Sequence, residues 1–105
     1  MSFRWPTKDP DEVLDYSIDW SRFLGTATIS TVTWYVDNAD GIKTQIGNTE
    51  VVDGIQNVTA TNTNTVATIN LGLGTLNKEY KFYCEINDST GSTAERVVKI
   101  RIKEQ

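Results

Sequence analysis

The stretch EYKFYCEIND, residues 79–88, shows the clearest alternation of apolar and polar side chains in the sequence. Successive side chains of a β-strand point to opposite faces of a sheet, so one row is expected to be buried and the other exposed. The expected inner row is Tyr80, Phe82, Cys84 and Ile86. The expected outer row is Lys81, Tyr83 and Glu85. We therefore predict a central strand here.

The same two-residue period recurs in four other stretches, each of which is expected to form a strand with one buried face. The expected inner residues are Leu14, Tyr16, Ile18 and Trp20, then Val32, Trp34 and Val36, then Ala67, Ile69 and Leu71, and finally Val98, Ile100 and Ile102. The last strand should turn three charged residues to water, which discourages pairing of an exposed sheet edge with another chain. These are Lys99, Arg101 and Lys103.

The segments between these strands are rich in residues that favour turns. DNADG at 37–41 and STGST at 89–93 are expected to be turns, with IKTQIG at 42–47 as a return strand. GLGTLN at 72–77 is expected to connect two sheets. Residues 48–65 are rich in Thr and Asn, which predicts short edge strands and exposed loops rather than core.

Strands separated by turns, with one helical turn at most at RFLG, predict an all-β fold. About seven strands would form an immunoglobulin-like antiparallel two-sheet sandwich. Trp34 and Cys84 stand where such a sandwich keeps its core Trp and its second Cys, but the sequence has no first Cys. The 105 residues suit one domain, with an extended N-terminal arm at residues 1–10 and the sandwich at 11–105.

The composition argues against several classes of function. With 38% hydrophobic residues the chain is too apolar for disorder, and no apolar run reaches the length of a membrane span. A formal net charge of -4 repels phosphate, so nucleic-acid binding is not expected. Without His and with a single Cys, neither enzyme activity nor a cofactor is expected. No secretory signal is recognisable, so the protein should remain in the cytoplasm of the cell that makes it.

The acid-rich stretch DPDEVLDYSIDW, residues 9–20, is a candidate metal or catalytic cluster. Calcium needs several oxygens at about 2.3–2.6 Å, whereas Asp15 and Asp19 of one strand would lie roughly 13 Å apart. A solvated strand face without a metal is therefore predicted. An acid pair for glycoside cleavage stays open, because any two carboxylates can meet in space. Cys84 lacks a His to activate it and is expected to be a core residue.

The first ten residues, MSFRWPTKDP, carry two aromatic residues and two prolines, and the prolines keep them out of a helix. Two arrangements stay open: the arm folds back over its own sandwich, or it buries its aromatic side chains in a neighbouring protein. In the second arrangement the acids that follow would belong to the same contact surface. The partner-binding residues of the arm would then be Phe3, Trp5, Asp9, Asp11 and Glu12.

Two further aromatic residues, Tyr35 and Tyr83, are expected on the outer faces of their strands. Exposed aromatic rings are common anchors in protein interfaces. Both are therefore candidate contact residues, and a carbohydrate platform that includes the Thr- and Asn-rich loops is the alternative to a protein contact.

Three stretches, KDPDEVLDYSIDWSRFLG, TVTWYV and YKFYCEINDSTGSTAERVVKIRIK, resemble short immunoglobulin-like virion proteins of tailed bacteriophages. The shared pattern is a DPD…LDY…DW start, a central Trp strand and a final hairpin with G…ER, over about nine tenths of the chain. The resemblance implies a non-enzymatic structural protein of the virion, made in the cytoplasm of the bacterial host.

Within the virion, the resemblance points first to a capsid decoration or cement protein that binds the lattice of the major capsid protein. The alternatives are a head-fibre, tail-fibre or neck component, and an adhesion module that binds host-surface carbohydrate. The implied partners are the major capsid protein or other virion proteins, with self-association on the particle also open.

Overall fold

The computed structural model describes the backbone of residues 2–104 and the side chains of residues 4–104. Its elements are β1 (Ser2–Arg4), β2 (Leu14–Asp19), α1 (Ser21–Leu24), β3 (Ile29–Asp37), β4 (Lys43–Gln45), β5 (Val51–Val52), β6 (Ile55–Asn62), β7 (Val66–Leu73), β8 (Glu79–Asp88) and β9 (Thr93–Arg101). All stretches with clear alternation are strands, and the only helix in this part of the chain is the single turn expected near RFLG.

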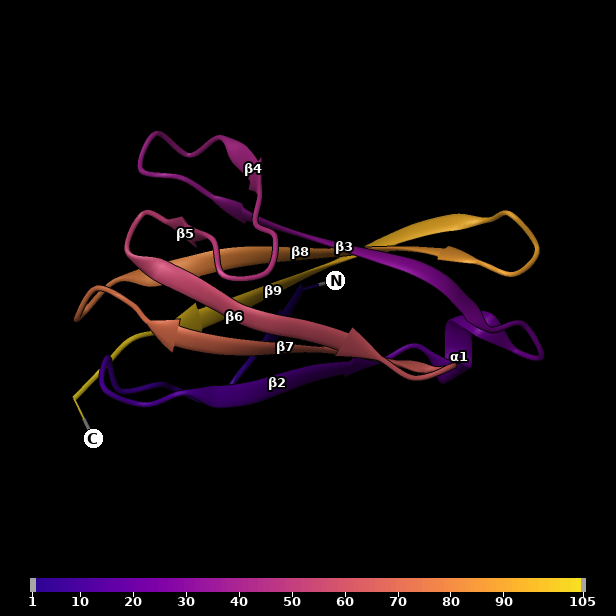
Figure 1. The fold of residues 1–105 in the computed structure, drawn as a ribbon, viewed down its shortest axis with the longest axis horizontal. Helices are drawn as coiled ribbons and strands as arrows, with labels where there is room; N and C mark the ends of the chain where they lie inside the picture. The colour runs from indigo at the N-terminus through magenta and orange to yellow at the C-terminus, as the bar shows by residue number, and fades with distance from the viewer. Residues whose placement is uncertain (1, 105) are drawn as a thin grey trace.

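The strands form two sheets packed face to face, which confirms the predicted all-β sandwich (Figure 1). One sheet has the strand order β1-β9-β8-β3-β4, and the other has the order β2-β7-β6-β5. Neighbouring strands are antiparallel except β1 and β9, which are parallel. The described residues hold more strands than predicted because β1 and β5 are too short to show alternation.

The central strand of the five-stranded sheet is β8, as its alternation predicts. It lies between β9 and β3, and Trp34 of β3 is paired with Cys84 of β8. The four residues predicted to face inward on β8 are all buried. The connection GLGTLN leads from β7 of one sheet to β8 of the other, which also agrees with the prediction.

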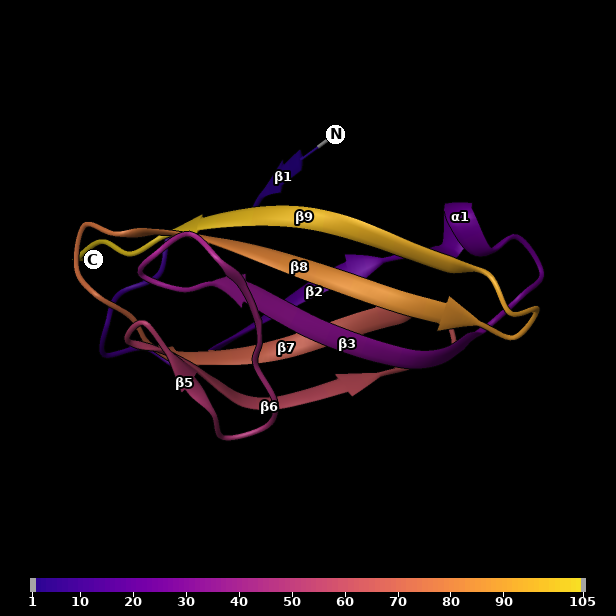
Figure 2. The same ribbon diagram turned by 90° about the horizontal axis from the view of Figure 1, so that it is seen from above.

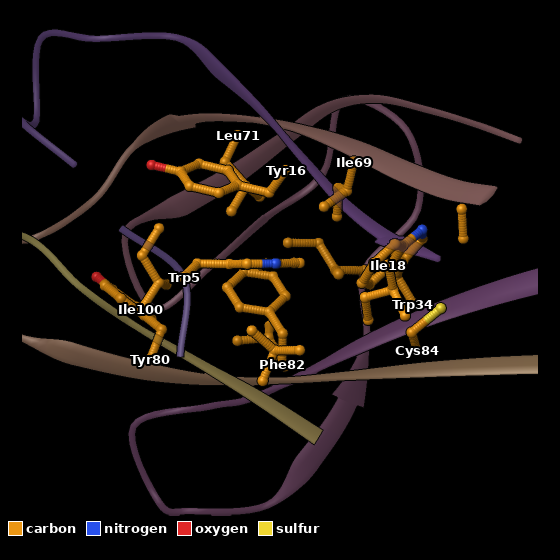
Figure 3. Packing of buried hydrophobic residues seen from close by; sticks show 14 of the residues in the cluster. Trp5, Tyr16, Ile18, Trp34, Ile69, Leu71, Tyr80, Phe82, Cys84 and Ile100 are labelled. Atoms are coloured by element: carbon orange, nitrogen blue, oxygen red, sulfur yellow. The ribbon is translucent and has the colours of Figure 1, made fainter. Parts of the chain in front are cut away.

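The core fills the space between the two sheets. The residues predicted to face inward are buried there, except that Leu14 and Val32 are only partly buried. Trp5 lies in the middle of this core, between Tyr16 on one side and Phe82 on the other (Figure 3). Its ring centroid is 4.9 Å from that of Tyr16 and 6.0 Å from that of Phe82. One N-terminal side chain therefore contacts both sheets.

Residues 48–65 contribute more to the sheet than the sequence predicted. β5 is a short edge strand, but β6 is an inner strand between β5 and β7, and Asn57 within it is buried. The β5–β6 hairpin turns at Asp53 and Gly54, whose φ angles are 49° and 87°. Two consecutive positive φ angles are typical of a type I′ turn, which favours Asp-Gly. Thr is common in half-buried strands, so the low hydrophobicity of this segment is compatible with an inner strand.

The described N-terminal residues do not project from the domain. β1 runs beside β9 as the outermost strand of its sheet (Figure 2), so β9 is not the edge strand that its charged outer face suggested. Further along, the Lys8 N–H donates a hydrogen bond to the Arg101 carbonyl at 3.1 Å. The arm thus follows the first of its two open arrangements and lies back on its own sandwich.

Candidate interaction surface

The structure places the predicted arm residues in different environments. The Trp5 side chain is only 9% exposed, and its Nε1 donates a hydrogen bond to the Ser17 carbonyl at 3.4 Å. This corrects the expectation that Trp5 is available to a neighbour, because the ring would first have to leave its own core. The backbone of Phe3 pairs with Val98, and its side chain lies outside the described residues.

Asp9, Asp11 and Glu12 form a tight turn beside the buried Lys8. The Asp9 N–H donates to Glu12 Oε1 at 3.0 Å, and the Asp11 N–H donates to Asp9 Oδ1 at 2.8 Å. Lys8 Nζ donates to the carbonyl oxygens of Leu73 and Asp9 at 2.5 and 2.8 Å. Burial lowers the pKa of Lys8, and the neighbouring carboxylates partly oppose that shift. The acids therefore balance a buried cation that the sequence did not mark as buried.

Asp15, Asp19 and Cys84 are each held by a local hydrogen bond or by burial. No group of three or more His, Cys, Asp or Glu among residues 4–104 is placed to hold a metal ion. Asp15 Oδ1 accepts a hydrogen bond from the Asn70 amide, and Asp19 Oδ1 accepts one from the Ser21 N–H at 2.9 Å. Burial raises the pKa of the Cys84 thiol to about 12, so it stays protonated at neutral pH. No helix in the described residues is long and apolar enough to cross a membrane.

Tyr35 and Tyr83 lie side by side on the outer face of the five-stranded sheet, as paired residues of β3 and β8. Lys43 Nζ lies 4.4 Å from the ring centroid of Tyr35 and 5.1 Å from that of Tyr83. The Tyr83 hydroxyl donates a hydrogen bond to Asp37 Oδ1 at 2.7 Å. Burial, with help from Asp37, raises the pKa of Tyr83 to about 12. An ammonium group thus lies over both rings, where a sugar ring would have to stack.

The same outer face gathers charged residues of both signs, with five Lys and Arg against the acids Asp37, Glu79, Glu85 and Glu95, and we refer to it as the basic face. It carries half of the ten Lys and Arg residues of a chain whose net charge is -4. These five are Arg4, Lys43, Lys81, Lys99 and Arg101. Alternation predicted that three of them face outward, but not that they share one surface, because strand order and register are not visible in a single sequence.

The opposite outer face, which belongs to the four-stranded sheet, has no positive residue. The strands β2, β5, β6 and β7 contain no Lys or Arg. Their outward residues are mainly small and polar, and Ser17 Oγ lies 2.8 Å from Thr68 Oγ1 across the β2–β7 pair. We refer to this surface as the polar face. Its outward residues include Asp15, Ser17, Asp19, Thr59, Thr61, Thr68 and Asn70.

The structure is thus of the class of small two-sheet β-sandwiches, with exposed side chains divided between two unlike outer faces. Residues 8–101 match the family model described as podophage GP4 fiber-tail adaptor protein gp77. Because the match covers most of the chain, the protein belongs to this family. It is therefore a bacteriophage virion component that assembles in the host cytoplasm. A comparison with curated proteins finds no match.

The family match decides between two expectations drawn from the sequence. It supports a structural protein of the phage virion, and it favours the fibre or tail component that was the alternative. It does not support a capsid decoration protein or the major capsid protein as partner. The match begins at Lys8, so β1 and Trp5 lie outside the matched residues although Trp5 fills part of the core.

Proposed function

We propose that this protein is a non-enzymatic adaptor that joins a fibre to the tail of a podophage. The observation that carries the proposal is the match of residues 8–101 to a fibre–tail adaptor family. An adaptor must bind two different proteins, so it needs two surfaces. The basic face and the polar face point in opposite directions and differ in charge, which suits contacts with two unlike partners.

Carbohydrate binding through Tyr35 and Tyr83 stays a weaker candidate. Sugar-binding sites commonly offer a free aromatic ring face, whereas Lys43 lies over both rings and also forms an ion pair with Glu95. The two rings are thus held in a packed unit with charged neighbours, which suits a protein contact better than sugar stacking.

The proposal can be tested with a phage from which this gene has been removed. Particles made without the protein should have filled capsids and tails but lack fibres, as counted by negative-stain electron microscopy. Supplying the protein from a plasmid should restore the fibres. Mutant particles that keep a full set of fibres but lose DNA from the capsid would contradict the adaptor role and support capsid decoration instead.

A further inference from the structure

Three positive side chains lie abreast on neighbouring strands of the basic face. Arg4 of β1 is paired with Lys99 of β9, and Lys99 is paired with Lys81 of β8. Side chains at paired positions have Cβ atoms about 4.5–5.5 Å apart, and like charges placed opposite each other destabilise a sheet. The three positive charges in this row therefore repel one another, which lowers rather than raises the stability of the fold.

Carboxylates of the chain relieve this repulsion only in part. Arg4 forms an ion pair with Glu79 at 2.7 Å, and Arg4, Lys99 and Arg101 together lower the pKa of Glu79. Within residues 4–104, neither Lys81 nor Lys99 forms an ion pair. Lys81 Nζ instead lies 5.3 Å from the ring centroid of Tyr83. Two ammonium groups thus stay available to an anionic group from outside.

An apolar row runs next to these cations. Tyr35, Tyr83 and Val97 are paired across β3, β8 and β9, and all three are half-buried. The next row beyond it contains the paired acids Glu85 and Glu95. The face therefore changes from positive through apolar to negative over three rows. A surface of this kind combines an apolar centre with charged groups that fix the orientation of a partner.

We propose that the basic face binds an acidic surface patch of another protein of the virion, with partner carboxylates opposite Lys81 and Lys99 and an apolar side chain against Val97. The proposal rests on the proposed function, which requires a protein partner. An acidic partner is complementary in charge to this row, because its carboxylates would remove the repulsion among Arg4, Lys99 and Lys81. A nucleic acid fits less well, because its regular phosphates would also meet Glu85 and Glu95 on a chain of net charge -4.

Chemical labelling of purified virions tests this contact directly. Acetylation of lysine amines should be strongly reduced at Lys81 and Lys99 in intact particles compared with the free protein, while the exposed Lys103 serves as the internal control. Zero-length carbodiimide cross-linking, which joins amines to carboxylates, should link Lys81 or Lys99 to Asp or Glu of a different virion protein. Links between two copies of this chain, or protection that nuclease treatment removes, would overturn the proposal.

A charge-reversal pair tests the same contact by genetics. The double variant Lys81→Glu and Lys99→Glu should reduce the copies per particle at least about tenfold in a phage that lacks the gene, because like charges across an interface cost several kcal/mol. The control Arg22→Glu with Lys103→Glu makes the same change in net charge at exposed sites elsewhere and should be incorporated normally. Thermal melting of both variants verifies folding.

The outcomes separate the contact from the adaptor role. Normal incorporation of the Lys81 and Lys99 variant, with fibres still dependent on the protein, would overturn the basic face as the contact and leave the adaptor role intact. Fibres that attach without the protein would overturn the adaptor role itself. If wild-type particles do not contain the protein, both proposals fail.

Discussion

The outer faces of the two sheets differ in charge, although both consist of regular strands of the same chain. The basic face gathers half of the Lys and Arg residues, and the polar face has none. Cross-strand pairs on the polar face are compatible, such as Ser17 with Thr68 and Asp15 with Asn70. Pairs on the basic face include Lys81 with Lys99, which repel each other. The lysines of the basic face are thus better explained by binding to a partner than by a contribution to folding.

The largest loss of stability is expected for a change at Trp5, whose ring contacts both sheets in the core. The substitution Trp5→Ala removes a buried ring that contacts Tyr16, Trp34 and Phe82. It should lower the free energy of unfolding by about 3–5 kcal/mol. Urea denaturation measures the change. The control is Phe23→Ala, because Phe23 is 42% exposed and should cost much less. Equal losses in the two variants would contradict the placement of Trp5.

A smaller effect is expected on the basic face for Tyr83→Phe. The substitution removes the hydrogen bond from the Tyr83 hydroxyl to Asp37 and should cost about 1 kcal/mol. The matched control is Tyr35→Phe, because the Tyr35 hydroxyl makes no hydrogen bond within the described residues. An equal loss in both variants, measured by urea denaturation at pH 7, would show that the hydrogen bond is not the cause.

Ionisation of the Tyr83 hydroxyl should make the stability of the folded protein depend on pH. The pKa of Tyr83 is raised to about 12 in the folded protein, whereas a tyrosine in the unfolded chain ionises near pH 10. The resulting stabilisation is present below about pH 10 and is lost as the pH rises through the folded pKa. The difference in stability between wild type and Tyr83→Phe should therefore shrink from pH 9 to pH 11.5. A constant difference across this range would count against the raised pKa.

A gain in stability is expected when the repulsive pair is made attractive. Lys99→Glu places a carboxylate between Arg4 and Lys81 and should stabilise the fold by about 0.2–1 kcal/mol. The same change should weaken incorporation into particles. Lys103→Glu provides the control, with little change in either property. A destabilised Lys99→Glu protein would show that the like-charge row does not strain the sheet.

The smallest effect is expected on the polar face. Ser17→Ala removes the hydroxyl contact with Thr68 on an exposed surface and should change the free energy of unfolding by less than about 0.5 kcal/mol. The variant should also leave the basic face and its charge unchanged. A loss above this value in urea denaturation would show that the hydroxyl contacts of the polar face contribute more to stability than a solvent-exposed pair should.

The sequence predicted well wherever alternation was strong. The inner and outer rows of β8 and β9 lie as expected, because a strand with one buried face imposes a period of two. The alternation also placed Lys81 and Lys99 on outer faces, where the structure has them half-buried, but their pairing needed the register of two strands that no single stretch contains. The sequence therefore predicted which residues of the candidate surface face outward, but not which of them lie next to each other.

The failures have local physical reasons. Asp53-Gly54 is a turn signal for a hairpin, but residues 48–65 were assigned from their Thr- and Asn-rich composition alone. Local pattern could not decide between the two arrangements of the arm, because β1 and the Trp5 N–H pair with β9 at the other end of the chain. Lys8 was overlooked for the same reason: a lysine is seldom buried, and only the tertiary fold supplies its carbonyl partners.

The most direct measurement is a cryo-electron microscopy reconstruction of the phage tail at a resolution that orients the sandwich. We expect this protein at the junction of tail and fibre, with the outer face of β3, β8 and β9 covered by an acidic surface of another virion protein. A reconstruction in which that face is open to solvent, with Lys81 and Lys99 far from any partner carboxylate, would contradict this expectation.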